Sequence, residues 1–348
     1  MLCQTKKRIE WQINLSNHLL DVPYAHITFT LPEDLRNLAK CNSRQIYNIL
    51  FRTAWATIKT VAKDKNNVGA LPGMIAVLHT FGSDLKYHVH VHSLVTFGGF
   101  DKDFNWVNPK RKDKIAGFRE LRNTFKELFL ESLQQHYQAD LINYHLDFDA
   151  VTCAAKGKTW VVNHQPPVMD TQRIENYLSK YICRTAVTPS RLHYDSAKQI
   201  VELIHKNYND QKIGEAAPLE IKHLSPLEAI HMIVRHKLPY GFHKSRYYGI
   251  HSSSTFKKAK KLVAPKYIRA KRTIKQLLSI LKLVEYLLGL PDSSIVRCKE
   301  CGSDDLVRFI ISADKTWPKK NIRNYTIPRS PPKARFNIKG IKKQKISF

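Results

Sequence analysis

Three histidines alternate with apolar residues in the run YHVHVHSLV, at His88, His90 and His92. Residues two apart in a β-strand point to the same face, so the pattern places all three imidazoles together. Imidazole nitrogens bind divalent metals and can contact phosphate, which makes this face a candidate metal or phosphate site. The alternative is a polar strand face turned to solvent, and the strict alternation with Val89 and Val91 favours the metal site.

A β-hairpin would bring a fourth histidine to the same face. Two β-rich runs, 73–81 and 86–97, are joined by the short turn-forming segment GSD, which is typical of a hairpin. If the turn centres near Ser83, His79 lies opposite His88 and on the shared face. His79 is then a candidate third metal ligand.

Two tyrosines, Tyr177 and Tyr181, are spaced four residues apart in a predicted helix over 172–184. Both phenols would lie on one helix face, where Lys180 could lower a phenol pKa or steady a phosphate. Two nucleophiles in one site would allow two successive phosphotyrosine linkages. The spacing alone favours ordinary core packing, and the helix becomes a candidate site only together with the histidine strand.

These side chains need a sheet and helices to position them. The run 24–31 alternates and predicts a strand, and 159–162 is a further candidate strand. Apolar residues at helical spacing predict helices over 42–63, with Ser43 as its cap, and over 113–137. Strands and helices that interleave, with hairpin-like joints, predict an α+β fold in which helices flank a mainly antiparallel sheet.

Charge points to a polyanionic partner. The chain has 348 residues, of which 43% are hydrophobic, enough for a sizeable core. The chain as a whole is therefore not a disordered tail. Its 57 Lys and Arg against 29 Asp and Glu give a formal charge of +28. We therefore expect nucleic acid as the first candidate partner and an anionic membrane surface as the second.

Neither a membrane span nor a signal peptide is predicted. The apolar run 277–290 is too short for a bilayer and is broken by Lys282 and Glu285. The chain has 6 cysteines, of which only Cys298 and Cys301 have a ligand-like spacing, and this does not indicate a disulfide framework. We expect a soluble protein in a reducing, cytoplasmic compartment.

Several segments together resemble one protein family. HVHVHSLV resembles the His-hydrophobic-His motif of the HUH single-strand endonucleases, and YLSKYICR resembles the two-tyrosine motif of their rolling-circle branch. HITFTLP resembles the first sheet strand of that family. HTFGSDLKYHVHVHSLVTFGG and HKLPYGFHKSRYYGI are similar to blocks of the two-tyrosine transposases of rolling-circle insertion sequences. The resemblance covers residues 6–251.

The resemblance implies an HUH-endonuclease-like sheet that holds one divalent ion. In such a site His90 and His92 would bind Mg²⁺ or Mn²⁺ against the scissile phosphate of single-stranded DNA, with His88 as an alternative ligand. Imidazole ligands suit Mn²⁺ better than Mg²⁺, so we expect Mn²⁺ to serve at least as well. The implied partners are the transposon ends and the target, in bacterial cytoplasm at the nucleoid.

The resemblance also implies the chemistry of the two tyrosines. Tyr177 or Tyr181 would attack the phosphate in line and form a 5′-phosphotyrosine and a free 3′-hydroxyl. The second tyrosine would then attack the target or the other end of the element, in rolling-circle-type DNA transposition. Lys180 is a further candidate catalytic residue.

Composition and the resemblance divide the chain into six segments. Cys3 is all that resembles the family's N-terminal zinc module, and the pair Cys298 and Cys301 is half of a structural Zn²⁺ site or a turn with two incidental thiols. The segments are a candidate remnant of the zinc module, 1–20; the HUH catalytic domain, 21–187; a transposase accessory region, 188–255; a basic helical segment, 256–290; a CxxC segment, 291–315; and a basic flexible tail, 316–348.

Basic residues near the C-terminal third form a candidate channel for single-stranded DNA. Lys and Arg would neutralise phosphates there, and nearby aromatic residues would stack on bases. A nonspecific electrostatic tether is the alternative. The candidate DNA-binding residues are Lys257, Lys258, Lys260, Lys261, Arg269, Lys271 and Arg272.

Three other functions compete with a transposase. A replication initiator shares the chemistry, but the transposase-like blocks around His79 and Tyr247 argue against it. A truncated, non-catalytic DNA-binding derivative would keep the charge and use the histidines for structural zinc. A zinc hydrolase lacks a general-base carboxylate at motif spacing, since Asp84 and Glu175 are the nearest candidates.

Overall fold

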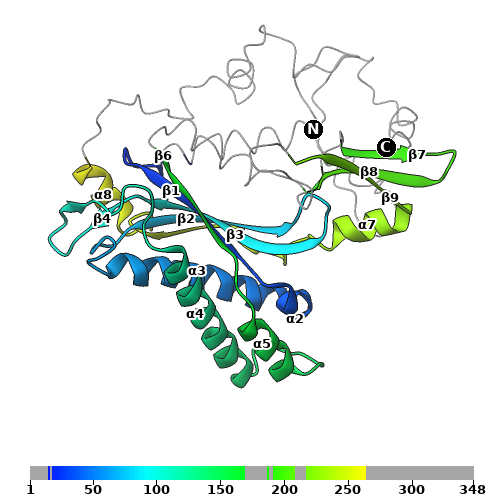
Figure 1. Cartoon of the computed structure of the whole chain (residues 1–348), viewed down its shortest axis with the longest axis horizontal. Coiled ribbons are helices and arrows are strands. Elements are labelled where there is room, and N and C mark those ends of the chain that lie inside the picture. The colour runs from blue at the N-terminus through cyan, green and yellow to red at the C-terminus, as the bar shows by residue number, and fades with distance from the viewer. Residues whose placement is uncertain (1–14, 16–17, 169–185, 188–190, 208–216, 264–348) are drawn as a thin grey trace, which may run out of the picture. The chain divides into compact units, whose positions relative to one another are not determined.

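An antiparallel sheet of five strands lies at the centre of the described structure (Figure 1). The computed structural model describes residues 15, 18–168, 186–187, 191–207 and 217–263. The strand order is β10-β2-β3-β1-β6, and every neighbouring pair is antiparallel. The strands are β1, Tyr24–Thr30; β2, Gly73–Phe81; β3, Tyr87–Thr96; β6, Val162–Val168; and β10, Ser245–Gly249.

Three of the four predicted strands are confirmed as β1, β2 and β3. The prediction of a strand over 159–162 is wrong, because β6 begins only where that run ends. Trp160 accounts for the difference, since its ring is buried among helices and its Nε1 donates a 2.9 Å hydrogen bond to the Ala155 carbonyl. Trp160 therefore packs with the helices, and the chain meets β1 only from the Val161 carbonyl onward.

Helices cover one face of the sheet (Figure 1). Alternate strand residues such as Ile27, Phe29 and Val91 point to this face and are fully buried against α3 and α4. This burial of apolar surface is the main source of stability for the layer. The helical elements are η1, Glu33–Leu35; α2, Arg36–Cys41; α3, Ser43–Lys63; α4, Phe118–Gln138; and α5, Phe148–Gly157. The predicted α+β fold, a mainly antiparallel sheet flanked by helices, is confirmed.

The predicted helices over 42–63 and 113–137 are present, with corrected starts, whereas the predicted helix over 172–184 lies outside the described residues. Ser43 is the first residue of α3 and not its cap, because Asn42 precedes the helix and uses its side-chain amide elsewhere, on the carbonyls of Leu38 and Asn143. α4 begins at Phe118, whereas the apolar period predicted a start at residue 113. Ile115 supplied that early signal, but it is buried in the core as part of the non-helical segment before the helix.

The opposite face of the sheet is partly covered by a second apolar cluster. Ile75 of β2 and Leu94 of β3 pair with each other there, and Ala259 of α8 (Phe256–Leu262) packs against them. Residues before β1, including Leu19, belong to the same cluster. The histidines lie further along β3 on this same face, beyond the apolar cluster.

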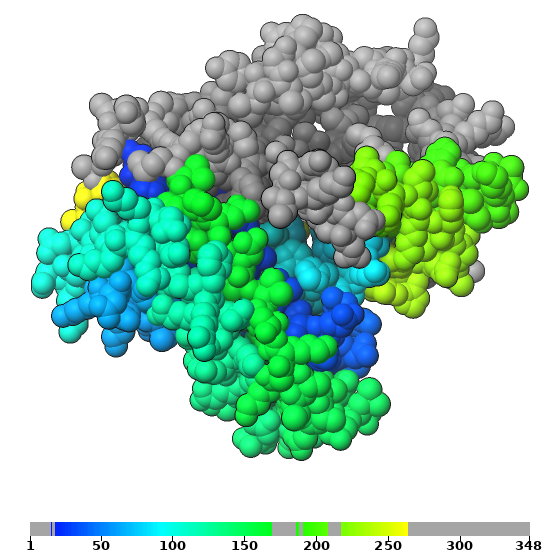
Figure 2. All heavy atoms as spheres, in the orientation of Figure 1, coloured from blue at the N-terminus to red at the C-terminus, as the bar shows by residue number. Residues whose placement is uncertain are grey.

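A separate three-stranded sheet follows in the chain, with order β7-β8-β9. It consists of β7 (Leu192–Asp195), β8 (Ile200–Lys206) and β9 (Leu219–Leu224), and α7 (Pro226–Val234) follows it. In Figure 2 these residues form one green to yellow-green part of the surface. No strands were predicted here from the sequence, because these short strands bury few alternating residues and give a weak pattern.

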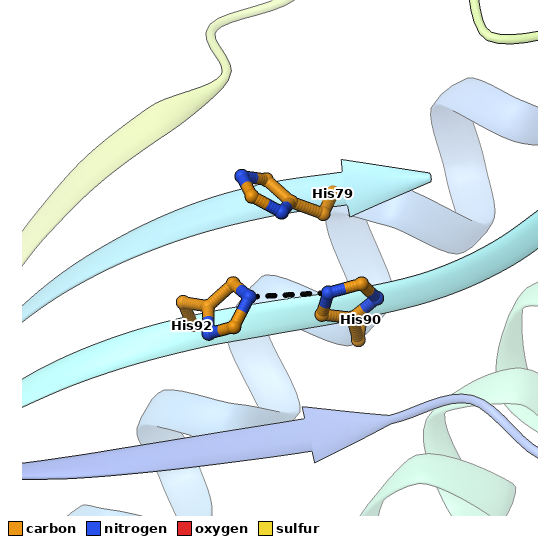
Figure 3. Close-up of side chains that lie close together, drawn as sticks. All are labelled: His79, His90 and His92. Carbon is orange, nitrogen blue, oxygen red and sulfur yellow. Dashed lines mark hydrogen bonds between the residues drawn. The ribbon is translucent and has the colours of Figure 1, made fainter. Parts of the chain in front are cut away.

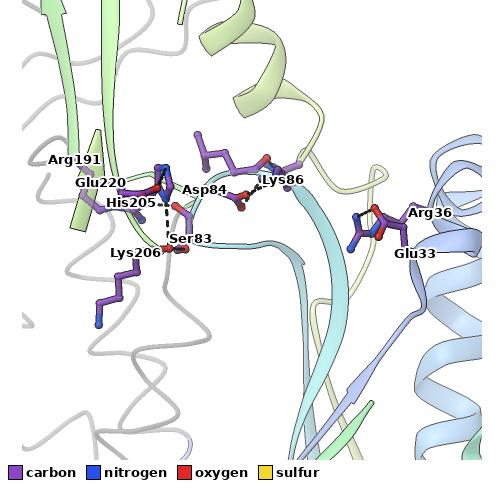
Figure 4. Close-up of polar contacts among 11 residues, drawn as sticks. Glu33, Arg36, Ser83, Asp84, Lys86, Arg191, His205, Lys206 and Glu220 are labelled. Carbon is purple, nitrogen blue, oxygen red and sulfur yellow. Dashed lines mark hydrogen bonds and ion pairs between the residues drawn. The ribbon is translucent and has the colours of Figure 1, made fainter. Parts of the chain in front are cut away.

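The three-stranded sheet holds the turn of the β2-β3 hairpin (Figure 4). Arg191 donates hydrogen bonds to the carbonyls of Ser83 and Ile204, and the Ser83 hydroxyl donates to the Lys206 carbonyl at 2.8 Å. Leu85 is fully buried in the apolar cluster between this sheet and α7. The turn of the histidine hairpin is thus anchored by residues more than one hundred positions later.

Two remaining features complete the described part of the chain. β4 (Gly99–Phe100) and β5 (Trp106–Val107) form a small two-stranded sheet. Among the described helices, none is both long and apolar enough to cross a bilayer.

Candidate metal centre

The histidines of β3 lie on the sheet face opposite the helices, as their spacing predicted. Val89 and Val91, which alternate with them, are fully buried in the helix-side core. Because side chains alternate along a strand, His90 and His92 point to the other face. Both are nonetheless buried, with exposed fractions of 9% and 7%.

The hairpin brings His79 to this face, but with a different partner from the one expected. His79 pairs with His90, not with His88. The register shifts between His79 and Phe81, so the hairpin contains an irregularity that a turn centred on Ser83 does not predict. The prediction of a shared face is correct, because a register that differs by two residues keeps each side chain on the same face of the sheet.

His79, His90 and His92 form a compact cluster (Figure 3). One ligand nitrogen from each lies within 4.8 Å of the others, and His90 Nε2 and His92 Nε2 are 3.1 Å apart. Two nitrogens that each bind one ion at about 2.1 Å, with a right angle between the two bonds, would be roughly 3 Å apart. The three residues therefore fit a divalent metal.

His90 has a defined orientation within this cluster. Its Nδ1 lies 2.9 Å from the His88 carbonyl oxygen, which can only accept, so Nδ1 carries the proton and donates it. The Nε2 lone pair is then available on the side of His92 and His79. A hydrogen bond of this kind at the outer nitrogen is usual for histidines that bind metals.

His88 lies beside the cluster but does not belong to it. Its ring centroid is 5.0 Å from that of His90, and its side chain is half-buried. Burial lowers the pKa of His88, with the Arg36 charge acting in the same direction. A neutral imidazole is the form that can bind a metal, so His88 stays a prediction as the alternative ligand.

Sequence reasoning did not identify two polar neighbours of the cluster on β1. His26 Nε2 lies 3.0 Å from His92 Nδ1, and the Thr28 hydroxyl oxygen lies 3.3 Å from that same Nδ1. Burial lowers the pKa of His26 to about 4, so its ring is neutral at pH 7. The alternation of HITFT placed both residues on the polar side of the predicted strand, but the sequence does not show which strand they face.

The predicted nucleophiles lie outside the described residues. This holds for Tyr177, Lys180 and Tyr181, and also for the cysteine pair at 298 and 301. Their placement in the site stays a prediction.

The candidate DNA-binding residues are described in part. Lys257, Lys258, Lys260 and Lys261 are exposed on α8, whereas Arg269, Lys271 and Arg272 lie outside the described residues. The Lys258 ammonium lies 3.2 Å from the centroid of the Phe104 ring, a cation–π contact that places a cation beside an aromatic ring. The role of these lysines in binding DNA stays a prediction.

Comparison with known proteins gives relatives of one kind. The family model described as "Putative transposase" matches residues 73–260. "Putative transposase y4qJ" of Sinorhizobium fredii (strain NBRC 101917 / NGR234) is 32% identical over 261 residues, which cover 71% of this chain and 63% of the relative. "Transposase for insertion sequence element IS801" of Pseudomonas savastanoi pv. phaseolicola is 26% identical over 250 residues, which cover 71% of this chain and 58% of the relative. The chain thus spans roughly three fifths of these relatives.

Among solved structures, one described as a conjugative relaxase TrwC in complex with OriT DNA is similar over 45% of this chain and 70% of its own. Its sequence identity is 12% and its TM-score is 0.26, so the likeness is weak.

Proposed function

Because the chain belongs to the "Putative transposase" family, we propose that it is a transposase that cuts and transfers single-stranded DNA by tyrosine transesterification. The observation that carries the proposal is the cluster of His79, His90 and His92 on one face of the central sheet. Three imidazoles at this separation suit a catalytic divalent metal, and the family supplies the substrate class. We propose this activity for the part of the relatives' length that this chain covers.

The histidine cluster would hold Mg²⁺ or Mn²⁺. Its all-imidazole donor set favours Mn²⁺ of the two. A divalent ion bound there would neutralise the charge that develops on the oxygens of the scissile phosphate. His90 and His92 would be oriented for this by the hydrogen bonds at their outer nitrogens.

Tyr177 and Tyr181 are the proposed nucleophiles. The phenolic oxygen of one tyrosine would attack the phosphorus in line, and the bond from phosphorus to the 3′ oxygen would break. The phenol proton would pass to the departing 3′ oxygen, which leaves a 5′-phosphotyrosine and a free 3′-hydroxyl. Lys180 would steady the phosphate, and the second tyrosine would take part in strand transfer.

Residues 21–187 would form most of the catalytic unit, with one addition. β10 lies within the segment 188–255 that we proposed as an accessory region, yet it pairs with β2 at the edge of the catalytic sheet. We therefore propose that β10 belongs to the catalytic unit. The three-stranded sheet would then be the accessory part inserted before it.

The formation of a covalent adduct tests this function. The protein would be incubated with Mn²⁺ and labelled single-stranded oligonucleotides, and a denaturing gel would resolve a protein–DNA adduct that protease removes. The adduct should disappear in the double variant Tyr177→Phe, Tyr181→Phe and in His90→Ala. Tyr240→Phe is the matched control, because Tyr240 is 98% exposed and does not belong to the histidine cluster, so the adduct should persist in this variant.

Two results would overturn the proposal. An adduct that survives in the double variant would move the nucleophile to another residue. DNA binding without any adduct, across oligonucleotides taken from insertion-sequence ends, would indicate a DNA-binding protein that lacks the chemistry.

A further inference from the structure

His236, which lies just after α7, contacts both strands of the histidine hairpin and its turn. Its Nε2 donates a 3.0 Å hydrogen bond to the Leu85 carbonyl, and its Nδ1 lies 3.3 Å from the Thr80 hydroxyl oxygen. The His236 ring meets the Phe81 ring edge-on, with centroids 5.6 Å apart, and stacks on Tyr87 at 6.3 Å with planes inclined by 11°. One side chain therefore joins the end of β2, the turn and the start of β3.

These contacts coincide with the register shift of the hairpin. The pairing of β2 with β3 is regular as far as His79, which lies opposite His90, and it shifts before Phe81. Thr80 is the residue between, and its hydroxyl is the group that lies beside His236. An irregularity of this kind changes the direction of the neighbouring side chains.

The shift is linked to the metal cluster through Phe81. The Phe81 ring stacks on the His79 ring, with centroids 5.3 Å apart and planes inclined by 14°. A slip of one residue here would turn His79 to the opposite face of the sheet. The outer neighbour of β2 gives no support at this point, because the printed register of β10 with β2 runs only from Gly73 to Val77.

We propose that His236 is a positioning residue for the candidate metal centre, whose hydrogen bonds fix the register shift at Thr80 and so hold His79 opposite His90 (Figure 3). This inference rests on the metal site of the proposed function and adds to it a residue from outside the two strands. The alternative is that His236 only stabilises the packing of the segment after α7 against the hairpin.

Two variants of the full chain separate the hydrogen bonds of His236 from its ring contacts. His236→Phe retains a ring beside Phe81 and loses both polar contacts. His236→Gln loses the ring, but its amide offers a donor for the Leu85 carbonyl and an acceptor for the Thr80 hydroxyl. Loss of a residue that orients a metal ligand typically lowers metal affinity by about 10–100-fold. We expect Mn²⁺, titrated by electron paramagnetic resonance, to bind His236→Phe about tenfold more weakly than the wild type, and His236→Gln within about threefold of it.

A double-variant cycle shows whether the effect passes through His79. In His79→Ala the remaining ligands are His90 and His92, so the direction of residue 79 no longer matters. His236→Phe should therefore change Mn²⁺ affinity by less than about twofold in this background. A merely structural role would lower the affinity equally with and without His79.

Ile142→Val is the control for a general loss of stability. Ile142 is buried in the helix-side core and is not among the contacts of His236. The Mn²⁺ affinity of this variant should stay within about twofold of the wild type.

A second readout needs no metal. Nuclear Overhauser effects between the backbone protons of residues 79 and 90 report the register of the hairpin. They should be present in the wild type and in His236→Gln, and they should weaken in His236→Phe. Thr80→Val keeps His236 and loses only the hydroxyl contact, so it should weaken the same effects and decides the question if His236→Phe does not fold.

The outcomes separate this inference from the proposed function. Unchanged Mn²⁺ affinity in a folded His236→Phe, an equal loss with and without His79, or unchanged effects between residues 79 and 90 would overturn the positioning role and leave the metal site standing. Absence of Mn²⁺ binding by the wild type, with weakened effects in His236→Phe, would instead overturn the metal site and leave His236 as the residue that fixes the register.

Discussion

At the scale of single residues, the histidine cluster depends on spacing along one strand and on pairing between strands. Period-two spacing places His90 and His92 on one face from the sequence alone, because alternation is a property of the strand itself. His79 followed from the hairpin. His26 did not, because its contact depends on the pairing of β1 with β3, two strands that are separated along the chain by helices and by β2. A single sequence does not encode the register between such strands in any local pattern.

A buried histidine away from the metal cluster predicts how stability changes in acid. His251 is 1% exposed, and its Nε2 forms a 3.1 Å hydrogen bond with the Tyr24 hydroxyl group. Burial lowers the pKa of His251 to about 3. In the unfolded chain His251 therefore binds a proton near pH 6.5, whereas in the folded protein it binds one only near pH 3. The free energy of unfolding should fall as the pH drops from 6.5 toward 3.

Chemical denaturation at a series of pH values, without divalent metals, measures this effect. His251→Gln removes the titrating group, so the free energy of unfolding should fall less steeply with acid in the variant than in the wild type. Equal slopes in the two proteins would contradict the assignment to His251.

At the scale of elements, the sequence predicted the parts with strong local patterns. The hairpin of β2 and β3 and the helices α3 and α4 are long and strongly periodic, and each was found. The short strands β7, β8 and β9 were missed, since four to seven residues that bury at most two side chains give little signal. The register of the hairpin was missed by two residues because of the irregularity after His79.

Leu85 connects the histidine hairpin to the three-stranded sheet, and its truncation should weaken both. The side chain is fully buried beside Leu203 and Met232, and His236 Nε2 donates a 3.0 Å hydrogen bond to the Leu85 carbonyl. Leu85→Ala should lower the free energy of unfolding by about 2–4 kcal/mol, the range typical of a buried leucine. Urea denaturation measures this loss.

Leu227→Ala is the matched control for that experiment. Leu227 lies on α7 in the same part of the chain but is 76% exposed, so its truncation should change the free energy of unfolding by less than about 0.5 kcal/mol. Similar losses in the two variants would contradict a role for Leu85 as an anchor.

At the scale of the whole molecule, the charge of +28 predicts how DNA binding responds to salt. Each phosphate neutralised on a single strand contributes a slope of about −0.7 to the logarithm of affinity against the logarithm of salt concentration. If all four α8 lysines contact phosphates, replacing Lys257, Lys258, Lys260 and Lys261 by alanine should reduce the magnitude of that slope by about 3. Fluorescence anisotropy with a labelled single-stranded oligonucleotide measures it.

The control removes the same charge from the helix layer on the other side of the sheet. Lys59, Lys63, Lys65 and Lys156 are exposed on or next to α3 and α5, away from the face that carries α8 and the histidines. Their replacement by alanine should leave the slope nearly unchanged. An equal reduction by both sets would indicate a nonspecific electrostatic tether in place of a binding surface.

The position of β10 at the edge of the sheet has a consequence for how the protein folds. β10 pairs with β2 although more than 160 residues separate them along the chain, and β6 joins on the other side from nearly as far. Contacts between distant residues slow folding, because the long intervening loop must close before the contact gains any free energy. On a growing chain, the histidine hairpin is synthesised early, when its neighbour β1 is already present but β10 and β6 are not. The candidate metal centre therefore acquires its complete sheet only after Gly249 has left the ribosome.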